Sequence, residues 1–145
     1  MKHIHFDVKS DGFYGAYWEC KGGSDCTVIA MLGDDPEDHM ARSAVKWLLR
    51  LGVNVLTMSP AKKDYSHHNY PLECIEKAIA WLKSHGSTKI GIAGASTTGT
   101  LALTAASIFD DISLTVAMTP SDFVWQGFEQ GKRDGCREWP VPNAS

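Results

Sequence analysis

The sequence predicts an α/β fold in which a mainly parallel sheet carries helices on both faces and is entered through an antiparallel N-terminal hairpin. Three patterns support this prediction. Apolar and polar residues alternate near the N-terminus, continuous apolar runs follow at intervals, and amphipathic segments with helical periodicity separate those runs. A chain of 145 residues with 43% hydrophobic residues can bury one core, so we expect residues 1–145 to form a single domain.

The hairpin is the first element expected. Ile4, Phe6 and Val8 alternate with polar residues, as in a strand with one buried face. The residues Ser-Asp-Gly at 10–12 then form a turn that leads into an aromatic run over 13–18. Two such segments joined by a turn are typical of paired antiparallel strands.

Strands and helices alternate in the rest of the chain. The run over 27–32 is continuously apolar, as expected for a strand that is covered on both faces. The clearest helix begins at Pro71, has Glu73 and Glu76 in its first turns, and ends at Gly86. The other expected elements are a helix over 38–51, a strand over 53–58, a strand over 89–95, a helix over 97–109 and a strand over 112–118. This regular alternation predicts a parallel sheet.

Charge and composition exclude several classes of protein. The formal net charge of -3, from 14 basic and 17 acidic residues, gives no basic surface for nucleic acid. No apolar stretch is long enough to span a bilayer, and the N-terminus does not resemble a secretory signal, so we expect no membrane association. We expect a cytoplasmic protein.

The cysteines and histidines predict no metal site and no redox motif. None of the four cysteines forms a C-x-x-C pair, and a disulfide between Cys20 and Cys26 is not expected although they flank a turn. The adjacent residues His67 and His68 are better explained as part of a polar loop than as ligands of one metal ion. We expect no cofactor.

The segment 89–103 contains the most informative motif, K-I-G-I-A-G-A-S-T-T-G-T-L-A-L, in which a strand passes through a glycine-flanked turn directly into a helix. Ser96 stands at this bend, where Gly94 leaves room for a tight turn. Such an elbow exposes a serine hydroxyl as a nucleophile and places the N–H of Thr97 to bind an oxyanion. The backbone of Gly33 or Asp34, after the earlier strand, is the expected second donor.

A phosphate-binding loop, a dinucleotide fingerprint and a helix cap are the other interpretations of this motif. A phosphate-binding loop would need lysine where Thr100 stands, and no G-x-G-x-x-G dinucleotide fingerprint occurs in the chain. Ser96 could instead cap the helix that follows it, because serine is a preferred residue at that position. The local motif leaves the nucleophile and the cap equally open.

The order of elements, the Gly94-Ala95-Ser96 elbow and the segment 69–85 together resemble the α/β-hydrolases. More narrowly, they resemble the acyl-CoA thioesterase and bile acid-CoA:amino acid N-acyltransferase branch, over about residues 27–118. The resemblance implies acyl transfer, in which Ser96 attacks a small acyl ester or thioester and acyl-CoA is a possible substrate. A carboxylesterase or a peptidase of the prolyl-oligopeptidase type would use the same front half of the fold.

Two features depart from that family. The family elbow usually has glycine two residues after the nucleophile, whereas this chain has Thr98 there and glycine only at Gly99, so we expect the β-branched side chain to crowd the turn. The family also orders its triad as nucleophile, acid and histidine. No histidine follows Ser96, because the six histidines all precede it, at positions 3, 5, 39, 67, 68 and 85.

These departures predict a truncated hydrolase domain, incomplete at its C-terminus, whose acid and histidine come from residues that are not in this chain. Asp122 is the one acidic residue after the last strand that stands where a functional group could lie. The segment 121–145 is expected to be an irregular tail. An unpaired sheet edge would favour a homo-oligomer or association with the missing C-terminal part, and a non-catalytic half that binds a partner is the alternative to an enzyme.

Overall fold

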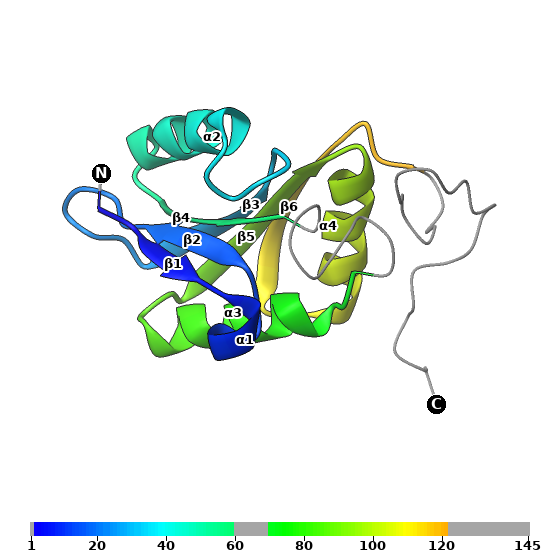
Figure 1. The fold of residues 1–145 in the computed structure, drawn as a ribbon, viewed down its shortest axis with the longest axis horizontal. Coiled ribbons are helices and arrows are strands. Elements are labelled where there is room, and N and C mark those ends of the chain that lie inside the picture. The colour runs from blue at the N-terminus through cyan, green and yellow to red at the C-terminus, as the bar shows by residue number, and fades with distance from the viewer. Residues whose placement is uncertain (1, 60–69, 122–145) are drawn as a thin grey trace.

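The computed structural model describes residues 2–59 and 70–121, and within them one six-stranded sheet is flanked by helices (Figure 1). Its strands are β1 (Ile4–Phe6), β2 (Gly15–Trp18), β3 (Cys26–Met31), β4 (Asn54–Met58), β5 (Lys89–Ala95) and β6 (Ile112–Met118). Its helices are α1 (Val8–Asp11), α2 (His39–Arg50), α3 (Glu73–Ser84) and α4 (Thr97–Ile108). The strand order in the sheet is β1-β2-β4-β3-β5-β6.

The N-terminal hairpin is confirmed, with one correction to its connection. β1 pairs with β2 in antiparallel register, with Ile4 opposite Tyr17, and β2 in turn pairs antiparallel with β4. Val8 was expected to continue the first strand but lies in the short helix α1 instead. The Asp7 carboxylate accepts a hydrogen bond from the Lys9 N–H and starts that helix, and Gly12 ends it with a φ of 82°.

The four strands from β3 to β6 are parallel to one another, as predicted. β3 lies between β4 and β5, and β6 pairs with β5 on the far side. β5 and β6 have the boundaries expected from their apolar runs, whereas β3 ends at Met31, so that Leu32 already belongs to the following loop. The ladder between β3 and β5 closes with Met31 opposite Gly94, immediately before the elbow.

Helices cover both faces of the sheet, as predicted. α2 packs on one face, where Val45 and Leu48 join a cluster with Trp18, Ala30 and Val55. α3 and α4 pack on the other face, where their apolar residues join a larger core with side chains of β3, β4 and β5. Figure 1 shows the sheet between α2 and α3. The hydrophobic stripes of the two amphipathic helices therefore account for the two layers.

β6 forms one edge of the described sheet. It pairs with β5 on one side and has no described strand on the other. Its residues Leu114, Val116 and Met118 are 61%, 47% and 45% exposed. They alternate along the strand and so lie on one face of it.

Two further predictions concern disulfide bonds and membrane-spanning segments. Cys20 and Cys26 are not bonded to each other, and Cys136 lies outside the described residues. No helix in the described part of the chain has the length and apolar character needed to cross a membrane.

Candidate functional site

Ser96 occupies a strained bend between β5 and α4. Its φ of 54° and ψ of -118° lie outside the regions that non-glycine residues favour, a conformation that costs of the order of 1–3 kcal/mol. Two backbone hydrogen bonds hold it: the Ser96 N–H donates to the Met118 carbonyl at 2.8 Å, and the Thr100 N–H donates to the Ser96 carbonyl at 3.1 Å. The serine side chain is exposed and makes no capping hydrogen bond to the helix. The helix-cap interpretation of Ser96 is therefore not supported.

Gly94 is required at this bend because no side chain fits there. A Cβ atom on Gly94 would lie 2.8 Å from the backbone nitrogen of Gly99 and closer still to the carbonyl oxygen of Thr98. Gly99 has somewhat more room, since its nearest neighbour would be the Met118 carbonyl oxygen at 3.0 Å. The close approach of β5 to the first turn of α4 thus depends on glycine at both positions.

Thr98 does not crowd the turn, contrary to expectation. Its side chain is only 5% exposed and fits between the ends of β3 and β5. Its hydroxyl oxygen lies 2.6 Å from the Met31 carbonyl oxygen and accepts a hydrogen bond from the Ala95 N–H at 3.0 Å. The β-branched residue therefore fits, because its hydroxyl is satisfied by the backbone around it.

The loop between β3 and α2 faces the elbow and is organised around Asp38. The Asp38 carboxylate accepts hydrogen bonds from the N–H groups of Asp34 at 2.7 Å, Asp35 at 3.1 Å and Ala41 at 2.8 Å. Burial alone would raise the pKa of this carboxyl, but the backbone N–H groups outweigh burial and hold its pKa below the ordinary value. Gly33 packs against the same carboxylate with a φ of 95°, and a Cβ on it would lie 2.7 Å from Asp38 Oδ2. The Asp34 N–H is thus already bonded.

The same loop is also held by Thr57 on β4, by Tyr14 just before β2, and by two histidines at β1. The Thr57 hydroxyl donates to the Pro36 carbonyl at 2.7 Å, and the Tyr14 hydroxyl donates to the Asp35 carboxylate at 3.2 Å. Glu37 is contacted by His3 and by His5, the latter at 3.1 Å. The backbone that faces Ser96 is therefore fixed by several independent hydrogen bonds.

Four predicted site residues line one open groove at the carboxyl ends of the parallel strands. Ser96, Thr97, Gly33 and Asp34 all border it, and its volume is about 880 Å³. Much of its remaining lining is apolar, from Met31, Leu32, Met40, Ala44, Trp47, Ala95 and Met118. Met40 and Trp47, which are 64% and 63% exposed on α2, were not predicted from the sequence to line the site. Two large apolar side chains outside the buried stripe of a helix were the signal that could have found them.

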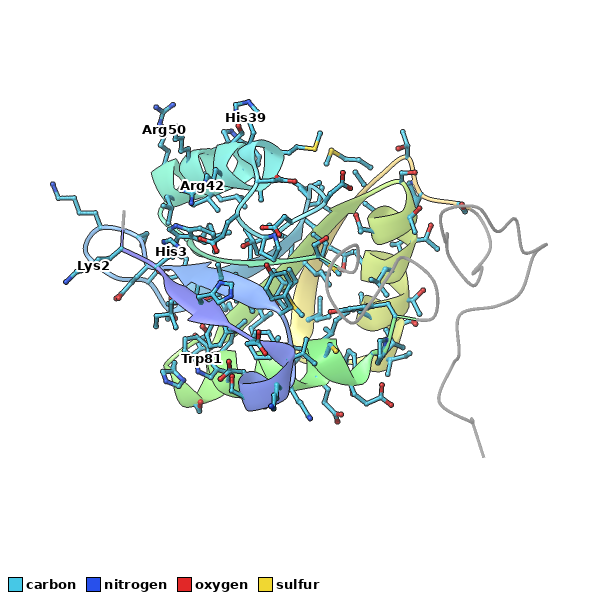
Figure 2. The ribbon with its side chains drawn as sticks, viewed as in Figure 1. Lys2, His3, His39, Arg42, Arg50 and Trp81 are labelled. Carbon is cyan, nitrogen blue, oxygen red and sulfur yellow. The ribbon has the colours of Figure 1, made fainter. Side chains whose placement is uncertain are left out.

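No described histidine is hydrogen-bonded to Ser96. His39 borders the groove, but Figure 2 shows its side chain directed from the start of α2 away from the sheet. His3 and His5 contact Glu37, and His85 stacks on Trp81 with ring centroids 3.8 Å apart. His67, His68 and Asp122, together with the tail over 122–145, lie outside the described residues.

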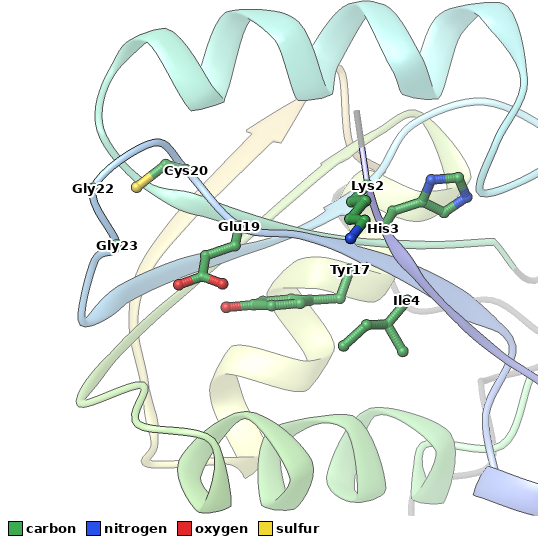
Figure 3. Close-up of a pocket in the computed structure, with 8 residues that line it drawn as sticks. All are labelled: Lys2, His3, Ile4, Tyr17, Glu19, Cys20, Gly22 and Gly23. Atoms are coloured by element: carbon green, nitrogen blue, oxygen red, sulfur yellow. The ribbon is translucent and has the colours of Figure 1, made fainter.

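A second hollow lies at the opposite end of the sheet. Its volume is about 890 Å³, and Figure 3 shows Lys2, Tyr17 and Glu19 among the side chains around it. It borders the end of β2 that pairs with the beginning of β4, so it opens at the amino ends of the parallel strands. Volume does not distinguish the two hollows, but position does, because ligands of open α/β sheets bind at the carboxyl ends.

Metal chemistry finds no support among residues 2–59 and 70–121. No group of three or more His, Cys, Asp or Glu side chains there is arranged to hold a metal ion.

Solved structures with a similar fold include two esterases and DcsB. An esterase of Pyrococcus furiosus, Pf2001, is 23% identical with a TM-score of 0.62, over 79% of this chain and 53% of that chain. Est1E from Butyrivibrio proteoclasticus is 21% identical with a TM-score of 0.58, over 81% of this chain and 51% of that one. DcsB in complex with its substrate analogue is 17% identical with a TM-score of 0.59, over 79% and 43%. The chain spans about half the length of these esterases, and at such identities the likeness shows the fold.

The sequence comparison gives a family. A search of curated proteins finds no match. The family model described as "BAAT / Acyl-CoA thioester hydrolase C terminal" matches residues 70–142, which is half of the chain and includes the whole elbow. With an α/β-hydrolase-like sheet around that elbow, the chain belongs to the BAAT/acyl-CoA thioester hydrolase C-terminal family.

Proposed function

We propose that this domain carries the nucleophile of an acyl hydrolase or acyltransferase, and that the nucleophile is Ser96. The observation that carries the proposal is the strained, exposed conformation of Ser96 at the strand-to-helix bend. Strain of this kind is retained where it serves a function, because an unstrained serine at a helix start would be more stable. An exposed hydroxyl with no capping role is free to attack a substrate.

In the proposed reaction the Ser96 Oγ forms a bond to the carbonyl carbon of an acyl thioester or ester. A histidine outside the described residues takes the hydroxyl proton and returns it to the departing thiol or alcohol as the carbon–sulfur or carbon–oxygen bond breaks. Water or an amine then attacks the acyl-serine ester, its proton passes to the same histidine, and the Ser96 hydroxyl is restored. The triad acid likewise comes from outside the described part.

The oxyanion would be held by two backbone N–H groups. Thr97 begins α4 directly after Ser96, so its N–H belongs to the unpaired first turn of a helix. Of the two residues predicted for the second donor, Asp34 already donates its N–H to Asp38. We therefore assign the second donor to Gly33, which borders the same groove.

The apolar lining of the groove favours a substrate with a hydrocarbon chain. Met40, Trp47 and Met118 line the groove and are exposed, so they offer surface to such a chain. Family membership favours an acyl thioester such as acyl-CoA, bound as substrate with no other cofactor. A carboxylic ester is the nearest alternative substrate. A cytoplasmic location is part of the proposal, since the free thiols of Cys20 and Cys26 suit a reducing compartment.

Covalent labelling tests this function directly. The chain, in the assembled domain that supplies the triad histidine and acid, is treated with an alkyl fluorophosphonate, and the hydrolysis of p-nitrophenyl acyl esters and of acyl-CoA is measured. Labelling at Ser96 that is lost in Ser96→Ala and kept in Ser107→Ala supports the proposal. Ser107 is a matched control, because it is an exposed serine on the same helix. Absence of labelling at Ser96 in the assembled wild-type domain contradicts the proposal.

Partner binding through β6 is a second candidate function, favoured by the exposed apolar side chains on that edge strand. An unpaired strand with apolar residues is a template for pairing with another chain, either a second copy or the rest of a hydrolase domain. Sedimentation measurements would show association that Leu114→Lys abolishes. Leu103→Lys is the control, since Leu103 is 43% exposed but lies on α4. Equal association of both variants excludes the β6 edge.

A further inference from the structure

We infer that Thr98 is a positioning residue that sets the spacing between the two halves of the proposed oxyanion hole. This inference rests on the function proposed for Ser96. The family elbow has glycine at this place, so the role belongs to this chain rather than to the pattern it shares. The contacts of one buried hydroxyl group carry the argument.

The Thr98 hydroxyl joins the ends of two strands. It accepts the Ala95 N–H at 3.0 Å, and its oxygen lies 2.6 Å from the Met31 carbonyl and 2.9 Å from the Ala95 carbonyl. A hydroxyl has one proton, and the shorter distance indicates that it is donated to Met31. One side chain thus links the last residue of β3 to the last residue of β5.

The hydroxyl takes the place of backbone hydrogen bonds where the pairing between β3 and β5 ends. The pairing of β3 with β5 ends with Met31 opposite Gly94, and beyond it the strands diverge toward the loop at Gly33 and the bend at Ser96. Divergence creates the groove but would leave a carbonyl and an N–H without partners. The Thr98 hydroxyl supplies both partners from within the gap.

The consequence for catalysis is geometric. Met31 lies two residues before Gly33, and Ala95 lies two residues before Thr97, so the hydroxyl is close in sequence to both proposed N–H donors. Oxyanion stabilisation requires both donors to lie at hydrogen-bond distance from one developing charge. A fixed distance between Met31 and Ala95 therefore fixes the separation of the donors.

The test compares Thr98→Ser, which keeps the hydroxyl, with Thr98→Val, which keeps the shape and removes it. Thr104→Val is the matched control, because Thr104 is buried in the same helix and its hydroxyl donates only to the Thr100 carbonyl, at 2.9 Å. Each variant, in the assembled domain that supplies the histidine and the acid, is assayed with p-nitrophenyl acetate and with an alkyl fluorophosphonate, well below its unfolding temperature. Hydrogen exchange of the Ala95 amide is measured in parallel.

We expect Thr98→Val to lower kcat and the labelling rate at least about ten-fold with little change in KM, since a misplaced donor acts on the transition state. Thr98→Ser and Thr104→Val should stay near the wild-type rates. The Ala95 amide should lose protection in Thr98→Val alone. Wild-type activity with an equally active Thr98→Val overturns the positioning role only. An assembled wild-type domain that is inactive and unlabelled overturns the function of Ser96, and with it this role.

Discussion

Three glycines near the elbow leave different amounts of space around their Cα atoms, and alanine substitutions at them should differ in cost accordingly. An added Cβ would meet its nearest neighbour at 3.4 Å at Gly91, which is ordinary contact, and at 3.0 Å at Gly99. At Gly94 it would overlap the backbone of Thr98 and Gly99. The predicted order of destabilisation is therefore Gly91→Ala, Gly99→Ala and Gly94→Ala, from least to most.

The magnitudes follow from what must move. Overpacking of a well-packed site costs about 1–3 kcal/mol, and the neighbours of Gly94 are backbone atoms that cannot rotate away, so we expect about 3 kcal/mol at that position. For a domain of this size that lowers Tm by about 10 °C. At Gly99 a smaller strain is partly offset by the helix propensity of alanine, worth about 1 kcal/mol. Gly91→Ala should lie within about 1 kcal/mol of the wild type.

Urea unfolding followed by circular dichroism gives these free energies, and the m-value shows whether the unfolding transition is unchanged. If Gly94→Ala costs no more than Gly91→Ala, the close approach of β5 to α4 is wrong, and with it the geometry from which the Ser96 elbow was argued.

Further predictions concern strain, charge and the groove. Ser96→Gly should stabilise the fold by about 1 kcal/mol, because glycine adopts a positive φ freely, whereas Ser43→Gly on α2 should destabilise it by a similar amount; equal signs in thermal unfolding would refute the strain. Asp38→Asn should cost about 1–2 kcal/mol at neutral pH, because both Asp38 carboxylate oxygens accept backbone N–H groups and an amide NH2 in place of one of them cannot. The pKa of Asp38 in the folded protein lies below its ordinary value of 3.8. The stabilisation by its carboxylate is therefore present above pH 3.8 and is lost as the pH falls through the folded pKa. Urea titrations over that range would show the free energies of unfolding of the wild type and of Asp38→Asn converging. Trp47→Ala should raise KM for long acyl esters but not for acetate, with unfolding unchanged, since Trp47 is 63% exposed; equal effects on both esters would contradict an acyl-binding groove.

Much of the fold followed from the sequence because burial imposes simple patterns on it. The boundaries of β5 match the apolar run that predicts it, since a strand covered on both faces has to be apolar along its length. β6 also has its expected boundaries, although most of its residues are not buried. The short helix α1 was not predicted, because four residues are too few to show a helical periodicity of apolar residues. Its cause is local, a carboxylate at Asp7 that accepts a backbone N–H, and such a bond competes with the alternation of a strand.

The sequence predicts which residues line the site but not the hydrogen bonds that they make. Gly33, Asp34, Ser96 and Thr97 do border one groove, because strand ends in a parallel sheet meet at one edge. That the Asp34 N–H is bonded to Asp38 depends on a carboxylate folding back across a turn, which spacing alone does not encode. The bulk of Thr98 led to the prediction that it crowds the turn. It fits because its hydroxyl forms hydrogen bonds with the ends of two strands.

The two edges of the described sheet are unequal, which limits how copies of this domain could assemble. At one edge β1 has three residues flanked by Lys2 and His3, and at the other β6 has seven residues with an apolar face. Strand addition thus has a direction, because only β6 offers enough length and apolar area. Two copies joined through β6 about a twofold axis would use up both extendable edges. Such an assembly stops at two and cannot grow into a fibre.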